Sequence, residues 1–279
     1  FGNKYIAKHR TGSAYYLSPK ELQKFSFTDI NKALRTVPGV SLYEEDGFGL
    51  RPNISLRGTS PERSSKITLM EDGVLIAPAP YSASSAYYFP TIARMEAVEV
   101  LKGSSQVQYG PFTTGDAINM ISSQIPTDFT GSVRASYGGF NSNQLHAKVG
   151  GNHKNIGYFI EYLNYGSDGF KTLESGKNTG FNKNDVVAKL RVQLFPNQAV
   201  KQTLDFKFQY ADEMGNETYL GLTEADFKTN PFSRYAASNN DKMTTDHTQY
   251  MLTHHLGFSK NLTLTTTFYR NNFARNWYK

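Results

Sequence analysis

The chain has 279 residues, with 30 Lys and Arg against 24 Asp and Glu, 18 Tyr, 19 Phe, one Trp and no Cys. This length suits one or two domains with a sizeable core. The lack of Cys excludes a disulfide framework, a Cys-based zinc site and a thiol nucleophile. No run of about eighteen apolar residues is present, which excludes a transmembrane helix but not the alternating strands of a transmembrane β-barrel. The net charge of +6 is scattered along the chain, so no nucleic-acid partner is indicated.

The chain begins at Phe1, and no basic and apolar leader follows it. We therefore expect a processed or trimmed start, with the signal peptide of an exported protein already removed.

The first half of the chain predicts a compact mixture of short helices and strands. Ser18 followed by Pro19 indicates the start of a helix that runs to Phe25. Thr28 is the expected N-cap of a second helix, which Pro38-Gly39 ends. Strands are predicted at 40–43, 53–57, 66–71, 74–76 and 97–102, with a tight turn at Asp72-Gly73. Ser13 and Ser60 are expected to be turn residues.

The second half alternates apolar and polar residues with period two, which indicates strands. In the clearest case, 185–194, Val186 and Leu190 share one face while Lys189 and Arg191 share the other. Seven such strands are predicted, at 132–137, 144–149, 156–165, 185–194, 203–210, 248–258 and from 261 to at least 270. Short turns alternate with long loops at 166–184 and 211–247, as in outer-membrane barrels. A soluble antiparallel sandwich with one wet face is the alternative that alternation alone leaves open.

Five short motifs carry a resemblance to a known family. They occur in the order DINKALRTVPGVSL, NISLRGT, ITLMEDGVLIAPAPY, MEAVEVLKGSSQVQYG and GDAINMIS. Together they resemble the plug domain of TonB-dependent outer-membrane receptors. The resemblance implies a mixed α/β plug at 1–126 and the first strands of a membrane β-barrel at 127–279. Plugged barrels have about 22 antiparallel strands, so the seven expected here would make this chain the N-terminal part of a longer protein.

The same resemblance implies a function and a location. Three further stretches, APAPYSASSAYYFP, YGPFTTGD and the loop around ETYLGLTEADF, resemble the ferric-citrate receptor branch. We expect a transporter, not an enzyme, that imports ferric citrate or another siderophore across the outer membrane of a Gram-negative bacterium. Its partners would be outer-membrane lipid and the TonB–ExbB–ExbD energy-coupling complex. The energy for import would have to come from that complex, because no Walker A motif for nucleotide binding is present. No cofactor or resident metal is expected.

Several alternatives for the function stay open. The cargo could instead be haem, cobalamin or an oligosaccharide. A passive porin or an adhesin barrel is a second class, although a passive pore gains nothing from a plug. A soluble lectin or enzyme with a sandwich fold is the third. His254-His255 does not favour a metal site, because adjacent strand residues point to opposite faces.

The resemblance also assigns residues that would hold the plug in place. Arg57 and Lys102 each end a predicted plug strand just before a Gly, and Glu99 lies nearby. In the family the matching cations pair with carboxylates of the barrel wall; solvated strand-end charges are the simpler alternative. Ser104 and Asp116 depart from the family pattern, which usually has Pro and Gly there.

A second set of residues is expected to contact cargo. Arg63 lies in the polar loop TSPERSSK, and its guanidinium could bind the carboxylate oxygens of an anionic chelate. The aromatic and cationic candidates in the other loops are Tyr81, Tyr87, Tyr88, Tyr219, Arg234 and Tyr235. For the three plug tyrosines, packing of the loop is an equal alternative.

Overall fold

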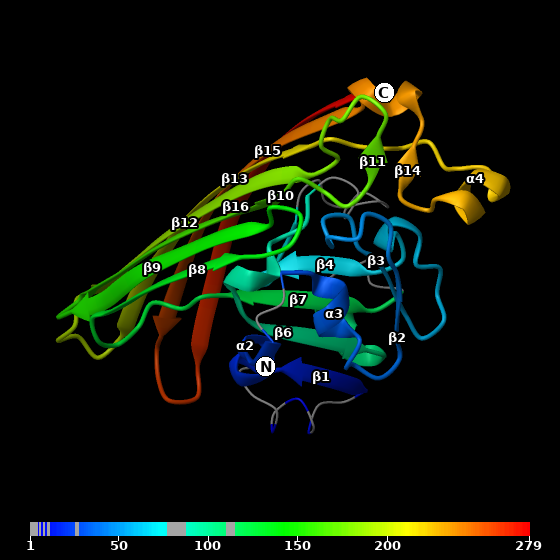
Figure 1. The fold of residues 1–279 in the computed structure, drawn as a ribbon. Helices are drawn as coiled ribbons and strands as arrows, with labels where there is room; N and C mark the ends of the chain where they lie inside the picture. Colours follow the sequence, from blue (N-terminus) through cyan, green and yellow to red (C-terminus); the bar gives the residue numbers. More distant parts are fainter. Residues whose placement is uncertain are drawn as a thin grey trace. The chain divides into compact units, whose positions relative to one another are not determined.

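The computed structural model describes residues 5, 7, 9, 12–25, 28–76, 88–109 and 115–279 (Figure 1). It divides into two compact units, Phe1–Gln124 and Ile125–Lys279, which are described separately below. None of the helices in the described ranges is long and apolar enough to cross a membrane.

The first unit is built on a five-stranded mixed sheet. Its strands are β1 (Ser13–Leu17), β4 (Thr68–Glu71), β5 (Val74–Leu75), β6 (Met95–Lys102) and β7 (Ala117–Ser122), in the order β1-β6-β7-β4-β5. β4 and β7 are parallel, and the other pairs are antiparallel. Val98, Val100 and Ile118 are fully buried on the central strands, so this sheet carries the core of the unit. β1 corrects the expectation for Ser13, which begins a strand paired with Lys102 and is not a turn residue.

Two short helices follow β1. α2 (Pro19–Phe25) begins as expected, because the backbone N–H and the hydroxyl of Ser18 both donate to Glu21 Oε2, at 2.9 and 2.6 Å. α3 (Ile30–Leu34) is capped by Asp29 and not by Thr28, since Asp29 Oδ1 accepts the N–H of Asn31 at 2.8 Å. The helix ends at Leu34, four residues before Pro38, whose ring disfavours helical backbone in the residue that precedes it.

A hairpin and three short 3-10 helices are the other elements of the first unit in the part of it that the structure describes. β2 (Val40–Tyr43) pairs with β3 (Asn53–Leu56), and the 3-10 helices are η1 (Glu62–Ser64), η3 (Ile92–Arg94) and η4 (Ser104–Tyr109). The turn predicted at Asp72-Gly73 is confirmed, with φ of 50° and 80° at its two central residues.

The second unit is a seven-stranded antiparallel sheet in the order β16-β15-β13-β12-β10-β9-β8. The strands are β8 (Thr130–Tyr137), β9 (Asn143–His153), β10 (Ile156–Ser167), β12 (Phe181–Leu194), β13 (Lys201–Gly215), β15 (Lys242–Gly257) and β16 (Thr263–Tyr278). All seven predicted strands are present, and most are longer than predicted. The loops contain β11 (Thr172–Leu173), α4 (Glu224–Thr229), β14 (Ser233–Arg234) and η5 (Ala236–Asn240), which the sequence did not indicate.

The two faces of the large sheet differ in chemistry. One face is apolar, and its side chains are largely exposed: Leu145, Ile160, Leu190, Phe206, Leu252 and Phe268. The other face carries ion pairs such as Lys183–Glu213 at 3.6 Å and Arg191–Asp205 at 2.6 Å. A soluble sandwich buries its apolar face in a core, so this arrangement contradicts the soluble alternative and is typical of a membrane barrel wall.

The pair His254-His255 is separated by the sheet as expected. His255 lies on the polar face, with Nε2 3.4 Å from Asp205 Oδ2, while His254 is opposite Leu204 on the apolar face.

Candidate functional site

The loop between β3 and β4 presents Arg63 to solvent. Arg63 is exposed, and both it and Ser64 adopt left-handed backbone, with φ of 50° and 53°. Such backbone is costly for residues other than Gly and persists only where neighbouring contacts impose it. The loop backbone that carries the Arg63 side chain is therefore held in one conformation.

Two buried side chains impose this loop conformation. Asn53 Oδ1 accepts the backbone N–H of Arg63 at 2.7 Å. The Ser64 hydroxyl, fully buried, donates to the carbonyl of Pro52 and accepts the N–H of Ile54, both at 2.9 Å. The loop is thus fastened to β3 on either side of the Arg63 side chain.

Arg57 forms an ion pair inside the first unit. Its Nε donates to Asp116 Oδ2 at 2.8 Å, and its Nη2 contacts Asp116 Oδ1. Asp116 is fully buried and also accepts the N–H of Gly103 at 3.0 Å, while half of the Arg57 side chain is exposed. This clasp joins the ends of β3 and β6 to the start of β7. The expected pairing of Arg57 with a carboxylate of the barrel wall stays a prediction.

The other two residues of the expected lock also have partners within this unit. Lys102 Nζ donates to the carbonyl of Pro38 at 2.8 Å. Glu99 is buried, and its Oε2 accepts from Asn119 Nδ2 at 3.0 Å. Lys102 therefore connects the end of β6 with the turn after α3.

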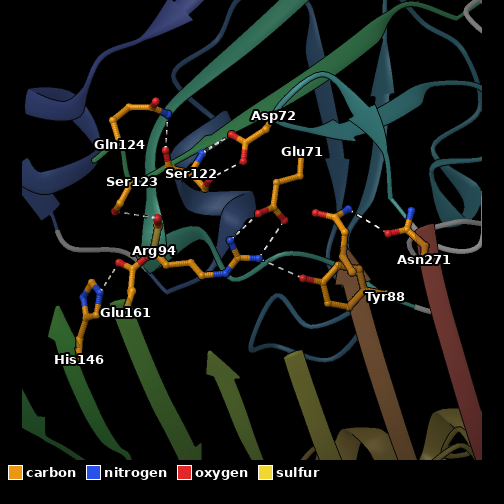
Figure 2. A network of polar contacts seen from close by, with 11 residues as sticks. Glu71, Asp72, Tyr88, Arg94, Ser122, Ser123, Gln124, His146, Glu161 and Asn271 are labelled. Atoms are coloured by element: carbon orange, nitrogen blue, oxygen red, sulfur yellow. Dashed lines mark hydrogen bonds and ion pairs between the residues drawn. The ribbon is translucent and has the colours of Figure 1, made fainter. Parts of the chain in front are cut away.

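Tyr88 belongs to a buried polar network that the sequence did not reveal (Figure 2). Arg94 Nη1 and Nη2 donate to the two carboxylate oxygens of Glu71 at 2.6 and 2.8 Å, and Nη2 also donates to the Tyr88 hydroxyl at 3.0 Å. Arg94 and Glu71 are both fully buried. The Tyr88 hydroxyl is therefore bound inside the first unit, and its contact with cargo stays a prediction. Tyr81 and Tyr87 lie outside the described residues.

A second group of contacts in Figure 2 fixes the hairpin of β4 and β5. Asp72 Oδ1 accepts the N–H of Ser122 at 2.9 Å, and its Oδ2 accepts the Ser122 hydroxyl at 2.5 Å. Gly73 N–H donates to Asn119 Oδ1 at 2.9 Å. The turn is thereby attached to the end of β7.

Within the second unit, Tyr235 and Arg234 lie in the loop that contains α4. The Tyr235 hydroxyl donates to Asp226 Oδ2 at 2.6 Å, and this bond, with a second one from Thr223, lowers the pKa of Asp226. Arg234 Nη1 donates to the carbonyls of Pro231 and Ser233, and partial burial lowers its pKa. Both side chains thus brace their own loop.

Tyr219 is half-exposed and packs against the end of β16. Its ring lies 5.4 Å from that of Trp277, edge to face. Lys279 Nζ lies 3.5 Å from the Tyr219 ring centre and 3.8 Å from that of Trp277. These cation–π contacts attach the start of the loop to β16.

The two long loops of the second unit are also linked to each other. β11 and β14 form a parallel pair that joins them. Ser175 Oγ donates to Asn239 Oδ1 at 2.7 Å, and the rings of Phe170 and Phe232 meet edge to face at 6.2 Å. The loops therefore form one connected layer and are not independent flaps.

No group of three or more His, Asp or Glu side chains that could hold a metal ion is found among the residues that the structure describes.

Comparisons with known proteins identify the first unit. Residues 7–115 match the model of the TonB-dependent Receptor Plug Domain. The chain is 26% identical over 178 residues to the vitamin B12 transporter BtuB of Photobacterium profundum, covering 62% of this chain and 28% of that protein. A plug is a receptor domain, so at the level of this domain the expectation of a non-enzymatic protein is confirmed.

Two solved structures share the fold of both units. The ferric citrate transporter FecA in its unliganded form has a TM-score of 0.78 at 21% identity, over 99% of this chain and 42% of that one. The ferric yersiniabactin uptake receptor FyuA from Yersinia pestis has a TM-score of 0.76 at 20% identity, over 97% of this chain and 42% of its own. The chain thus spans less than half the length of these relatives. It carries a TonB-dependent receptor plug domain and the N-terminal region of the barrel, in the outer membrane of a Gram-negative bacterium.

Proposed function

We propose that this chain belongs to a TonB-dependent importer that carries an anionic ferric chelate across the outer membrane. The plug match and the barrel-type sheet support the transporter class. In this proposal the energy comes from an inner-membrane TonB–ExbB–ExbD complex, which remodels the plug so that cargo passes inward.

The observation that carries the choice of cargo is the presentation of Arg63. Its guanidinium is exposed on a loop whose backbone Asn53 and Ser64 fix. A loop whose backbone is already held loses less conformational freedom when an anionic ligand binds, and a guanidinium can bind a carboxylate through two hydrogen bonds. Ferric citrate presents such carboxylates, and other ferric siderophores present related oxygen donors.

Cobalamin is the second candidate, and the 26% identity to a vitamin B12 transporter favours it. The two cargoes differ in what they require of Arg63. A chelate with several exposed carboxylates gains a charge-assisted hydrogen bond from this residue, whereas cobalamin presents mostly neutral amide groups and a single phosphodiester and gains less.

The test compares Arg63→Ala with Lys66→Ala, an exposed cation at the end of the same loop. Equilibrium binding of radiolabelled ferric citrate would be measured on the full-length receptor in detergent. Loss of a charge-assisted hydrogen bond, about 1.5–3 kcal/mol, predicts affinity lowered about ten- to a hundredfold in Arg63→Ala. Lys66→Ala should change it less than about twofold.

The binding measurements distinguish the role of Arg63 from the identity of the cargo. Equal ferric-citrate affinity in wild type and Arg63→Ala would reject Arg63 as a ligand. Wild-type receptor that binds cobalamin but no ferric citrate or other ferric siderophore would reject the chelate and favour the second candidate. A thermal melt of both variants controls for folding, because an exposed loop cation should change stability by less than about 0.5 kcal/mol.

A further inference from the structure

The strand register of the large sheet defines rows of side chains that share its apolar face. One row is Tyr162, Val186, Tyr210, Thr248 and Asn272, which are directly opposite one another on β10, β12, β13, β15 and β16. The next row toward the long loops is Leu145, Asn164, Asn184, Asp212, Asp246 and Ala274. A row runs perpendicular to the strands, so it would mark one membrane depth only if the strands stood upright.

The boundary between apolar and polar side chains does not follow a row. Toward the long loops, the apolar run ends at Leu145 on β9, Tyr162 on β10, Val186 on β12, Tyr210 on β13, Tyr250 on β15 and Phe268 on β16. The row that begins at Leu145 reaches β16 at Ala274, six residues beyond Phe268. The boundary keeps to one row at Tyr162, Val186 and Tyr210. It lies one row nearer the long loops at Leu145, and one and two rows farther from them at Tyr250 and Phe268. From β9 to β16 the boundary therefore slides by three rows in total.

This slide gives the tilt of the strands against the membrane. Six residues correspond to about 20 Å along a strand, and the five steps from β9 to β16 correspond to about 24 Å across the sheet. Their ratio gives a tilt of about 40°, within the range of 35–45° for outer-membrane barrels. On β12 the apolar run from Val186 to Leu194 covers about 27 Å of strand, or about 21 Å of depth at this tilt, which is close to an apolar band of about 25 Å.

The tilt explains the position of Arg270, a cation that would face the apolar part of the membrane if each row marked one depth. Arg270 shares a row with Ile160, Ala188, Phe208 and Tyr250, as if it lay within the apolar band. An Arg facing the bilayer midplane is strongly unfavourable. With the boundary on β16 at Phe268, Arg270 lies just outside the band and faces the headgroups.

The polar side chains at the first two positions beyond the boundary on β10, β12, β13, β15 and β16 form a polar belt, defined as Asn164, Asn182, Asn184, Asp212, Asp246, Thr248, Arg270 and Asn272. Asn184 links three strands: its Oδ1 accepts from Asn164 at 2.9 Å, and its Nδ2 donates to Asp212 at 2.9 Å. The hydroxyls of Tyr162 and Tyr210, at the top of the apolar run, reach up to Asn184 and Asp246 at 3.0 and 3.1 Å. Arg270 Nε donates to Asn272 at 3.0 Å. These bonds order the belt in three groups: Asn164, Asn184 and Asp212 with Tyr162; Asp246 with Tyr210; and Arg270 with Asn272.

We propose that the polar belt is a docking surface for the phosphorylated sugar headgroups of glycolipid in the outer leaflet. The belt lies toward the long loops, which face outward in such barrels. It continues the lipid-facing apolar band without a gap, so the headgroups of the same lipids meet it. Amide, carboxylate and tyrosine groups hydrogen-bond sugar hydroxyls, and Arg270 adds a cation for phosphate. The proposal rests on the outer-membrane location and not on the choice of cargo.

Spin-label depth measurements test the tilt on the full-length receptor in vesicles, in a background without Cys. The labels are placed by Tyr162→Cys, Phe268→Cys and Asn272→Cys. The oblique boundary predicts equal depth at 162 and 268, with 272 nearer the outer surface by about 10 Å, the depth of four residues at this tilt. Equal depth at 162 and 272, which share a row, would overturn the tilt and with it the belt.

Lipid selectivity tests the docking itself. The receptor would be reconstituted in vesicles of phosphatidylethanolamine with or without lipid A, and retained lipid A counted by native mass spectrometry. The double variant Asn164→Leu/Asn184→Leu and the single variant Arg270→Leu should each retain at least about tenfold less lipid A than wild type. Asn276→Leu, on the same face beyond the belt, is the matched control and should retain as much as wild type. Unchanged retention in the belt variants would overturn the proposal even if the depths follow the oblique boundary.

Discussion

The clasp between Arg57 and Asp116 makes an asymmetric prediction about plug stability. When Arg57 is removed, the fully buried carboxylate of Asp116 loses its charged partner. Its remaining hydrogen bond is the one from the N–H of Gly103. Breaking a buried pair from this side costs about 3–5 kcal/mol. Removing Asp116 instead leaves a half-exposed guanidinium that water can solvate, so the cost is limited to the lost charged hydrogen bonds, about 1.5–3 kcal/mol.

Backbone strain separates two replacements of Asp116. Its φ of 86° lies in the left-handed region, where a residue other than Gly costs about 1–2 kcal/mol. Asp116→Gly removes that strain together with the ion pair, whereas Asp116→Ala keeps the strain. We therefore expect destabilisation in the order Arg57→Ala, then Asp116→Ala, then Asp116→Gly.

Hydrogen exchange of the full-length receptor, followed by mass spectrometry on peptides that cover β3 and β7, measures this order. A loss of about 3 kcal/mol raises the exchange rate of globally protected amides roughly a hundredfold or more, since each 1.4 kcal/mol is tenfold. Peptides from the barrel strands serve as the internal control. Equal exchange in Arg57→Ala and Asp116→Gly would refute the reasoning, because it would mean that neither burial of the carboxylate nor strain determines the cost.

Three further outcomes are expected. Glu71→Gln should destabilise the plug by about 3–5 kcal/mol, because it removes the carboxylate that balances the buried charge of Arg94; unchanged exchange of β4 peptides would contradict this. Arg57→Ala combined with Lys102→Ala should loosen the plug and raise antibiotic sensitivity of cells while the barrel still assembles, since both side chains tie strand ends inside the plug; wild-type sensitivity would show that these ties do not retain it. Burial raises the pKa of Asp29 above its value of 3.8 in the unfolded chain, so the folded state binds this proton more tightly and loses stability as pH rises between the two pKa values. Exchange of α3 amides should show this loss in wild type and not in Asp29→Asn, which keeps a capping oxygen; identical pH profiles would reject it.

The large sheet was predictable from the sequence because its signal is local. Alternation with period two marks a strand wherever one face is apolar, as at 185–194. The same signal fails beyond the apolar band, which is why β12 begins at Phe181 and not at 185: its outward residues there are Asn182 and Asn184 of the polar belt. Pairing with β13 continues through these residues, and pairing leaves no trace in the pattern of one strand.

The plug contacts were not predictable, because they join residues far apart in sequence. Asp116 is 59 residues from Arg57, and Arg94 is 23 residues from Glu71. Asp116 stood out in the sequence only as a departure from Gly at a turn. A carboxylate at a position that favours left-handed backbone is a signal of a specific partner that the sequence analysis did not use, and it does not identify that partner. The exposed position of Arg63 was predictable, since it follows from the polar loop around it.

Left-handed backbone in the plug connects the candidate cargo loop with the clasp. Arg57 and Asp116 both have positive φ, so neither residue can relax without breaking the ion pair that holds the other. Arg63 and Ser64 store the same kind of strain six and seven residues after Arg57, in one continuous segment whose two ends are fixed by different buried partners. A force or a ligand that displaces one end of this segment must either stretch the bonds at the other end or release them. Because strained residues favour release, contact with the segment 57–64 at the surface would act on the ion pair at the end of β3.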